Sequence, residues 1–168
     1  HLLGRRQRQM CIRDRPLSPF KDAGELEDKC HNIFKSVDPV LGDYFGVMRK
    51  ENLLDLDNRK GKAPGGYCTE YPFQRLPFIF MNAVGTHSDV QTMIHEGGHA
   101  FHVFESAELP FSSQRDVGME FAEVASMAME LLASPYLTVD NGGFYTDKES
   151  SRARIEHLEK IIMFWPYM

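Results

Sequence analysis

The sequence has no long hydrophobic run. None of its 168 residues belongs to a stretch of about 20 apolar residues, the length that a helix needs to cross a bilayer. The N-terminal segment is rich in arginine, and no apolar core of a secretory signal follows it. These absences argue against membrane insertion and secretion. We therefore expect a cytoplasmic protein without a membrane partner.

Cysteine is scarce as well. The three cysteines, Cys11, Cys30 and Cys68, are odd in number and widely spaced, and no C-x-x-C pair occurs. This pattern argues against a disulfide framework and against a zinc site made of cysteines. We interpret all three as free thiols.

Positive charge is also in short supply. The 19 lysine and arginine residues stand against 24 aspartate and glutamate residues, which gives a formal net charge of −5. Proteins that bind nucleic acid usually carry a basic surface, so this balance argues against a nucleic-acid partner. Hydrophobic residues make up 42% and charged residues 26% of the chain, close to the averages of globular domains.

Residues 1–15 differ from the rest of the chain. They contain five arginines against the single acidic residue Asp14, and they show no sustained helical or strand-like period before Pro16. We interpret them as a non-native or disordered basic leader, similar to a translated sequencing-adapter remnant, and exclude them from reasoning about the fold. A natural basic arm is the alternative.

The remaining sequence alternates between helical and strand-like patterns. Apolar residues recur at three- and four-residue steps between Ser18 and Met48, with a break at Asp38 and Pro39, which predicts two helices. The predicted elements that follow are a charged loop rich in glycine and proline at 55–66, strands at 67–71 and 77–84, a helix from about 89 to 104, a helix at 119–133 and a final helix capped by Asp147. The fold class is therefore mostly α, with a small sheet (α+β).

The clearest chemical signal is His95-Glu96-Gly97-Gly98-His99, an HExxH motif inside a predicted helix. Successive residues of an α-helix are about 100° apart, so His95 and His99 point within about 40° of each other, one turn apart. Both imidazoles can therefore bind one zinc ion. Glu96 lies beside them without having to bind the ion, which is the position of a general base that takes a proton from zinc-bound water.

Catalytic zinc usually has three protein ligands, so one more residue is required. The metzincin extension of the motif would place glycine at position 102 and histidine at 105, but the sequence has His102 and Glu105, which excludes that class. The candidates on the next predicted helix are Glu120, Glu123 and Glu130. Glu120 and Glu123 are one turn apart, and geometry alone allows either to face the metal.

Segments 85–102 and 120–132 resemble the thimet oligopeptidase and oligoendopeptidase F family of M3 zinc metallopeptidases. In that family a glutamate ligand follows the HExxH helix within an F-x-E-x-x-S pattern, and Phe121, Glu123 and Ser126 occupy these positions here. The resemblance implies that Glu123 is the third ligand of one zinc ion per chain. It also implies a gluzincin-type, zincin-like catalytic core that combines the HExxH helix, a glutamate-ligand helix and the small sheet.

The same resemblance implies the activity, that of a zinc-dependent metalloendopeptidase that hydrolyses peptide bonds in short oligopeptides. In this scheme zinc polarises the scissile carbonyl, while Glu96 deprotonates the zinc-bound water and later returns the proton to the leaving amine. Short peptides are then the expected partners. We also expect strands 67–71 and 77–84 to present one edge near the motif helix, where backbone groups could pair with an extended substrate.

Residues 16–168 are interpreted as a partial metallopeptidase catalytic domain. The family places a segment rich in tyrosine and glycine well after the ligand glutamate, and nothing after Glu123 matches it. The final predicted helix also keeps an apolar face to its end, which is typical of a surface that packs against a neighbour. We therefore expect the missing C-terminal part of the same domain to be a partner of this chain, and the chain alone to have little activity.

Several residues keep two interpretations. Gly97 and Gly98 either allow the substrate or a neighbouring element to approach closely, or have no role. His102 is either a structural histidine or a site residue. Glu120 and Glu130 either orient the zinc-binding histidines or are ordinary solvated side chains.

Two other functions remain open. Another HExxH hydrolase, such as a peptide deformylase, would use a cysteine as third ligand, and Cys68 is the one near enough in sequence. A non-catalytic zinc-binding fragment would keep the fold and the metal without turnover.

Overall fold

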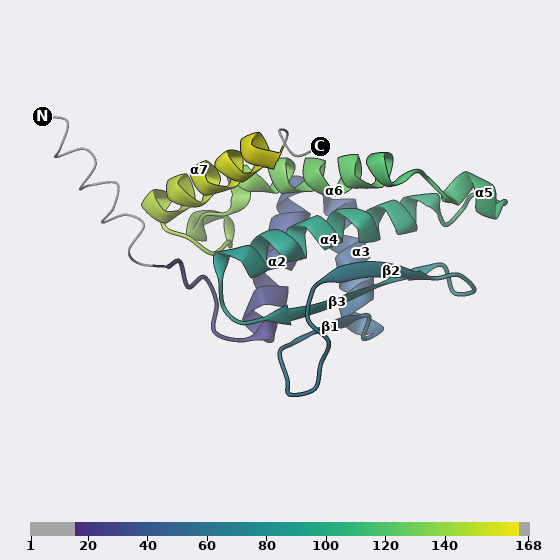
Figure 1. The fold of residues 1–168 in the computed structure, drawn as a ribbon, viewed down its shortest axis with the longest axis horizontal. Coiled ribbons are helices and arrows are strands. Elements are labelled where there is room, and N and C mark those ends of the chain that lie inside the picture. Colours follow the sequence, from purple (N-terminus) through teal and green to yellow (C-terminus); the bar gives the residue numbers. More distant parts are fainter. Residues whose placement is uncertain (1–15, 165–168) are drawn as a thin grey trace, which may run out of the picture.

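The computed structural model describes residues 16–164, so the leader predicted at residues 1–15 lies outside the described residues. Within them the chain is mostly helical with one small sheet, as the sequence predicts (Figure 1). The main helices are α2 (Ala23–Val37), α3 (Pro39–Lys50), α4 (His87–Ser106), α6 (Met119–Ala133) and α7 (Asp147–Phe164). None of the described helices is long and apolar enough to cross a membrane.

The first two helices begin where short acidic side chains can cap them. Asp22 caps α2 by accepting a hydrogen bond from the backbone N–H of Glu25 at 2.8 Å. Asp38 ends α2 in an extended conformation and caps α3, whose first residue is Pro39. Proline disfavours a helical conformation in the residue before it and needs no N–H partner at the start of a helix. The predicted break at Asp38 and Pro39 is thereby confirmed.

The sheet contains β1 (Leu54–Asp57), β2 (Tyr67–Tyr71) and β3 (Leu76–Ala83), in the order β1-β3-β2. The central strand β3 is parallel to β1 and antiparallel to β2. The strands predicted at 67–71 and 77–84 are confirmed. Because β2 is the last strand in the order, one of its edges is open to another chain.

The loop predicted at 55–66 is wrong at its start, because residues up to Asp57 belong to β1. The side chain of Lys62 is 2% exposed, and its ammonium donates hydrogen bonds to the backbone carbonyls of Asp55, Asp57 and Met81. This buried charge ties the loop to β1 and β3. The loop composition does not reveal the interaction, since one of its partners, Met81, lies on a later strand.

Two smaller differences concern the helix connections. The segment between the predicted helices at 89–104 and 119–133 forms the short helix α5 (Ser112–Arg115). The 3-10 turns η1 (Ser134–Tyr136) and η2 (Val139–Asn141) join α6 to α7. Thr146 rather than Asp147 caps α7. Its hydroxyl donates to the Glu149 carboxylate at 2.8 Å, and that carboxylate accepts the backbone N–H of Thr146 at 3.1 Å.

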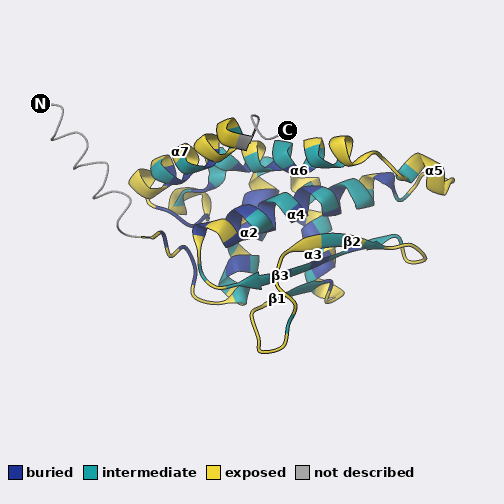
Figure 2. Cartoon of the chain, in the orientation of Figure 1, coloured by how far each residue is buried: buried dark blue, intermediate teal, exposed yellow. Residues whose placement is uncertain are grey.

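The motif helix α4 lies between the sheet and α6 (Figure 1). Buried residues therefore occur along much of its length (Figure 2). A Cβ added at Gly98 would lie 2.6 Å from the Cα of Ser126 on α6, and one added at Gly97 would lie 2.6 Å from the Phe34 ring on α2. Of the two interpretations of these glycines, close approach of a neighbouring element is therefore the one that the packing supports.

Replacing Gly98 by alanine is expected to lower the free energy of unfolding by about 1–3 kcal/mol, because the new methyl group overlaps the backbone of α6. Gly46→Ala on α3 is the matched control. The nearest atom to its added Cβ is 3.9 Å away, and alanine is the better helix former, so this variant is expected to gain stability. Chemical denaturation followed by circular dichroism measures both changes. Unchanged stability of Gly98→Ala would contradict the close packing.

Candidate metal centre

The start of α4 is fixed by a pair of reciprocal hydrogen bonds. The Thr86 hydroxyl accepts from the backbone N–H of Asp89 at 3.3 Å, and the Asp89 carboxylate accepts from the backbone N–H of Thr86 at 2.8 Å. This capping box sets the phase of the helix and therefore the direction of every later side chain. His95 and His99 point to the same side, with ring centroids 5.0 Å apart and ring planes at 84°.

Glu123 on α6 faces both histidines. Its two carboxylate oxygens lie 3.2 Å from His95 Nε2 and 3.6 Å from His99 Nε2. The three candidate ligand atoms all lie within 4.8 Å of one another. Ligands placed 2.0–2.1 Å from a tetrahedral ion are roughly 3.3–3.4 Å apart, so these separations suit a single small metal ion. Ser126, one turn further along α6, donates a hydrogen bond to the Glu123 carboxylate at 3.2 Å.

The other two glutamates of α6 lie elsewhere. Glu120 is exposed to solvent and is not part of the group that could hold a metal. Glu130 is half-buried on the far side of His95, where its Oε1 accepts a hydrogen bond from His95 Nδ1 at 2.6 Å. Burial by itself would lower the pKa of His95, but the hydrogen bond to Glu130 and the nearby negative charges raise it above its ordinary value.

A third histidine, His157 on α7, completes this arrangement. It is 5% exposed, and its Nε2 lies 3.2 Å from the second oxygen of Glu130. Glu130 thus stands between two imidazoles, one from the motif helix and one from the last helix. Sequence reasoning missed His157, because nothing in the helical period of α7 indicates that this position faces α6 rather than the core.

Glu96 is 8% exposed, and its burial raises the pKa of the carboxyl group above its ordinary value. Its carboxylate accepts a hydrogen bond from the backbone N–H of Cys68 on β2. On the central strand β3, the backbone N–H of Ile79 points towards β1 and donates to the carbonyl of Leu53, just before that strand, at 3.0 Å. Cys68 on β2 lies opposite Ile79 in the antiparallel pair, and the two do not exchange backbone hydrogen bonds. The N–H and C=O of Cys68 therefore point away from β3, to the open edge of β2. That edge consequently faces the motif helix.

Two residues with open interpretations lie nearby without joining the triad. His102 is half-buried one turn beyond His99, and its Nε2 has no hydrogen-bond partner among residues 16–164. Burial raises the pKa of the Cys68 thiol to about 12. Within the same residues the possible metal-binding group is His95, His99 and Glu123, and Cys68 is not part of it. The arrangement thus gives no support to a cysteine-ligated, deformylase-like site.

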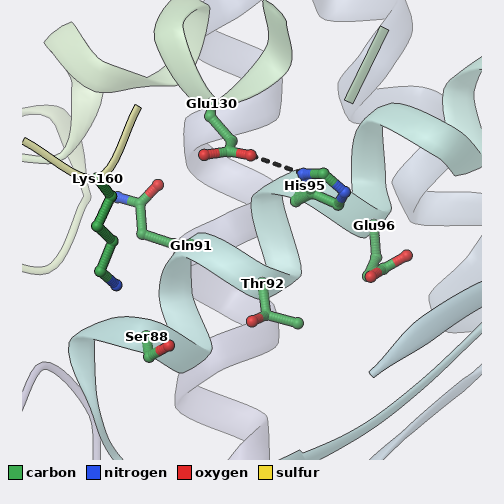
Figure 3. Close-up of a pocket in the computed structure, with 7 residues that line it drawn as sticks. All are labelled: Ser88, Gln91, Thr92, His95, Glu96, Glu130 and Lys160. Carbon is green, nitrogen blue, oxygen red and sulfur yellow. Dashed lines mark hydrogen bonds and ion pairs between the residues drawn. The ribbon is translucent and has the colours of Figure 1, made fainter. Parts of the chain in front are cut away.

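A cleft of about 210 Å³ extends along α4 from His95 towards the start of the helix. Residues of α4 line one side of it, and Glu130 of α6 and Lys160 of α7 also contribute (Figure 3). The residues of α4 are Ser88, Gln91, Thr92, His95 and Glu96. Lys160 comes from α7, which therefore contributes to both the cleft and the surroundings of His95. The sequence offered no signal for this role of α7.

Comparison with known proteins relates this site to one group of peptidases. Two curated relatives are 30% identical to the chain: an oligoendopeptidase F homolog of Mycoplasma genitalium over 120 residues, and oligopeptidase PepF of Bacillus subtilis over 124 residues. These matches cover 69% and 70% of the chain but only 20% and 18% of the relatives. The chain thus spans about a fifth of the length of the curated relatives it matches.

Solved structures give the same relationship. PZ peptidase A in complex with an inhibitor and a putative oligoendopeptidase F from Bacillus anthracis are each 33% identical to the chain, with a TM-score of 0.81. Each match covers 91% of the chain, and 26% and 27% of the respective structures. The model of peptidase family M3 matches residues 36–165. This match takes in the sheet, the motif helix and the helix that carries Glu123, and the chain therefore belongs to peptidase family M3.

Proposed function

We propose that this chain carries the zinc-binding catalytic core of an endopeptidase that hydrolyses short oligopeptides. The observation that carries the proposal is the convergence of His95, His99 and Glu123 on one point, with the buried carboxyl group of Glu96 beside them. Membership of family M3 and the likeness to oligoendopeptidases support the reaction class.

The donor set fits zinc. Two imidazole nitrogens and one carboxylate are the ligands of many catalytic zinc sites, which keep a fourth position open. Glu130 binds the Nδ1–H of His95, so the lone pair of Nε2 is left to face the metal point. The half-buried position of the triad also favours a bound cation over a solvated cluster of charges.

The proposed mechanism assigns one role to each group. When bound at the triad, zinc supplies a Lewis acid that polarises the scissile carbonyl and acidifies water. Glu96 accepts the proton of the attacking water, and its raised pKa makes it a stronger base than an exposed glutamate. The same carboxyl group then returns the proton to the amine that leaves. The N–H of Cys68 orients this carboxylate through its hydrogen bond.

The open edge of β2 is the proposed backbone partner of the substrate. Cys68 presents its C=O on this edge, since its N–H is bound to Glu96. Glu70, two residues later, presents both its N–H and its C=O. An extended peptide can pair with these groups through main-chain hydrogen bonds, which recognise any sequence. This interpretation supports a preference for unstructured oligopeptides.

A zinc-binding chain without turnover is the second candidate. Large apolar side chains on the outer faces of α6 and α7 are exposed, among them Phe121 at 76%, Val124 at 62% and Ile162 at 67%. Surfaces of this kind usually contact another element or protein. Turnover and metal content, measured separately, distinguish the two candidates.

Glu96→Gln is expected to abolish hydrolysis while leaving zinc bound, because an amide cannot accept the proton and Glu96 is not a ligand. Zinc content is measured by mass spectrometry on this chain, and peptide turnover on a full-length homologue with the same substitution. Loss of zinc from the variant would mean that Glu96 binds the metal.

Glu123→Ala is expected to weaken zinc binding by at least a hundredfold, since it removes one of three ligands. Glu120→Ala is the matched control, because the same change one turn away removes an exposed carboxylate outside the triad. Competition with a chromophoric chelator measures both affinities. The ligand assignment is wrong if Glu120→Ala is the more damaging change.

His157→Leu is expected to weaken zinc binding about tenfold, because Glu130 then loses the partner that holds it against His95. His157→Gln should recover part of the loss, since an amide N–H at this position can donate a hydrogen bond to Glu130. Ile155→Ala, at an exposed position on the same helix, should leave the affinity unchanged. Equal effects of His157→Leu and His157→Gln would show that only packing matters.

A further inference from the structure

The end of the cleft away from Glu96 gathers donors of hydrogen bonds. Lys160, Gln91 and Ser88 all line this part of the cleft (Figure 3). Lys160 is exposed, and no carboxylate among residues 16–164 forms an ion pair with it. A positive charge is thus available at this end.

Gln91 is the second sign of a ligand site. It is only 8% exposed, yet its Oε1 is buried without a hydrogen-bond partner among the described residues. A buried polar atom usually has a partner, and an unpaired one costs free energy. An amide can present either its oxygen or its N–H groups to a molecule in the cleft. The unpaired atom of Gln91 is its oxygen, so this side chain is suited to accept a hydrogen bond from a backbone N–H of a bound peptide.

The direction of the edge strand decides which part of a peptide reaches this end. Gly66, just before β2, lies against Thr92, since a Cβ added to it would be 2.9 Å from the Thr92 side chain. Two residues later Cys68 contacts Glu96, four residues further along α4. Strand β2 and helix α4 therefore run in the same direction along the cleft.

A substrate that pairs antiparallel with β2, the slightly more stable arrangement, must then run opposite to α4. Its C-terminal side passes from Glu96 towards Gln91 and Ser88. Along the helix axis Gln91 is about 7.5 Å and Ser88 about 12 Å from Glu96. An extended chain covers these distances in roughly two to four residues.

From this placement we infer that Ser88 and Lys160 form a subsite for a carboxylate of the peptide, two to four residues after the scissile bond, while Gln91 accepts a backbone N–H of the same peptide. The inference rests on the proposed function and adds to it a preference within oligopeptides. Glu96 lines the opposite end of the cleft, and Glu130, between the two ends, is bound to His95, so a negatively charged group is best placed at the Lys160 end. The carboxylate comes either from a free C-terminus or from an acidic side chain.

The test compares binding of acetylated peptides of graded length, made of alanine and leucine, with the C-terminus as a free acid or as an amide. A third set keeps the amide but carries glutamate as the last residue, which separates the two sources of the carboxylate. Affinities are measured on the zinc-loaded chain with Glu96→Gln, so that bound peptide is not turned over. We expect the free acid of the best length to bind about five to ten times more tightly than its amide.

Lys160→Met should abolish this preference without changing the affinity for the amide, and Lys160→Glu should reverse it. Lys148→Met is the matched control, because it removes an exposed lysine at the opposite end of α7 and should keep the preference. If acid and amide bind equally well to the unsubstituted site, the subsite is wrong while the proposed function stands. If no peptide of any set binds, both are wrong for this chain.

Discussion

The contact between α4 and α6 determines the geometry of the candidate site. Gly98 has no side chain, so the two helix backbones approach each other at Ser126 more closely than any other residue would allow. His99 follows Gly98 directly, and Glu123 lies one turn before Ser126 on the facing helix. The separations of 3.2 and 3.6 Å between the Glu123 oxygens and the two imidazoles follow from that approach. A wider spacing of the helices would leave three ordinary side chains instead of a metal-binding group.

The close approach of α4 and α6 also concentrates negative charge, which the surrounding structure has to accommodate. Three carboxyl groups surround two imidazoles, and each has a neutral or basic partner of its own. Ser126 donates to Glu123, the Cys68 N–H donates to Glu96, and His95 donates to Glu130. Glu123 contributes to the raised pKa of Glu96, so the repulsion is only partly relieved. A divalent cation at the triad would remove much of what is left.

The sequence predicted the elements that local patterns determine. The HExxH spacing and the β-type composition of 67–71 each depend on neighbouring residues, and the fold agrees with them. The choice between Glu120 and Glu123 required information beyond the local pattern, because the helical period allows both to face the metal. Resemblance to a family favoured Glu123, and the packing of α6 on α4 places this glutamate, rather than Glu120, against both histidines.

What the sequence could not predict depends on contacts between distant elements. His157 and Lys160 belong to a helix that local patterns describe only as amphipathic, and their positions beside Glu130 and the cleft follow from how α7 packs. The start of the loop at 55–66 was misread for a related reason. The residues there look unsuited to a strand until the pairing with β3 is known.

The buried ammonium of Lys62 also bears on how the open edge of β2 is kept ready. A loop rich in glycine and charge would ordinarily sample many conformations, and the strand that follows it would share in that freedom. Here one side chain binds carbonyls of β1 and β3 at once and holds the loop between them. The entropy of ordering this edge is therefore lost during folding rather than on association. Any extended segment that pairs with β2 meets a preorganised partner, and its affinity is not reduced by that cost.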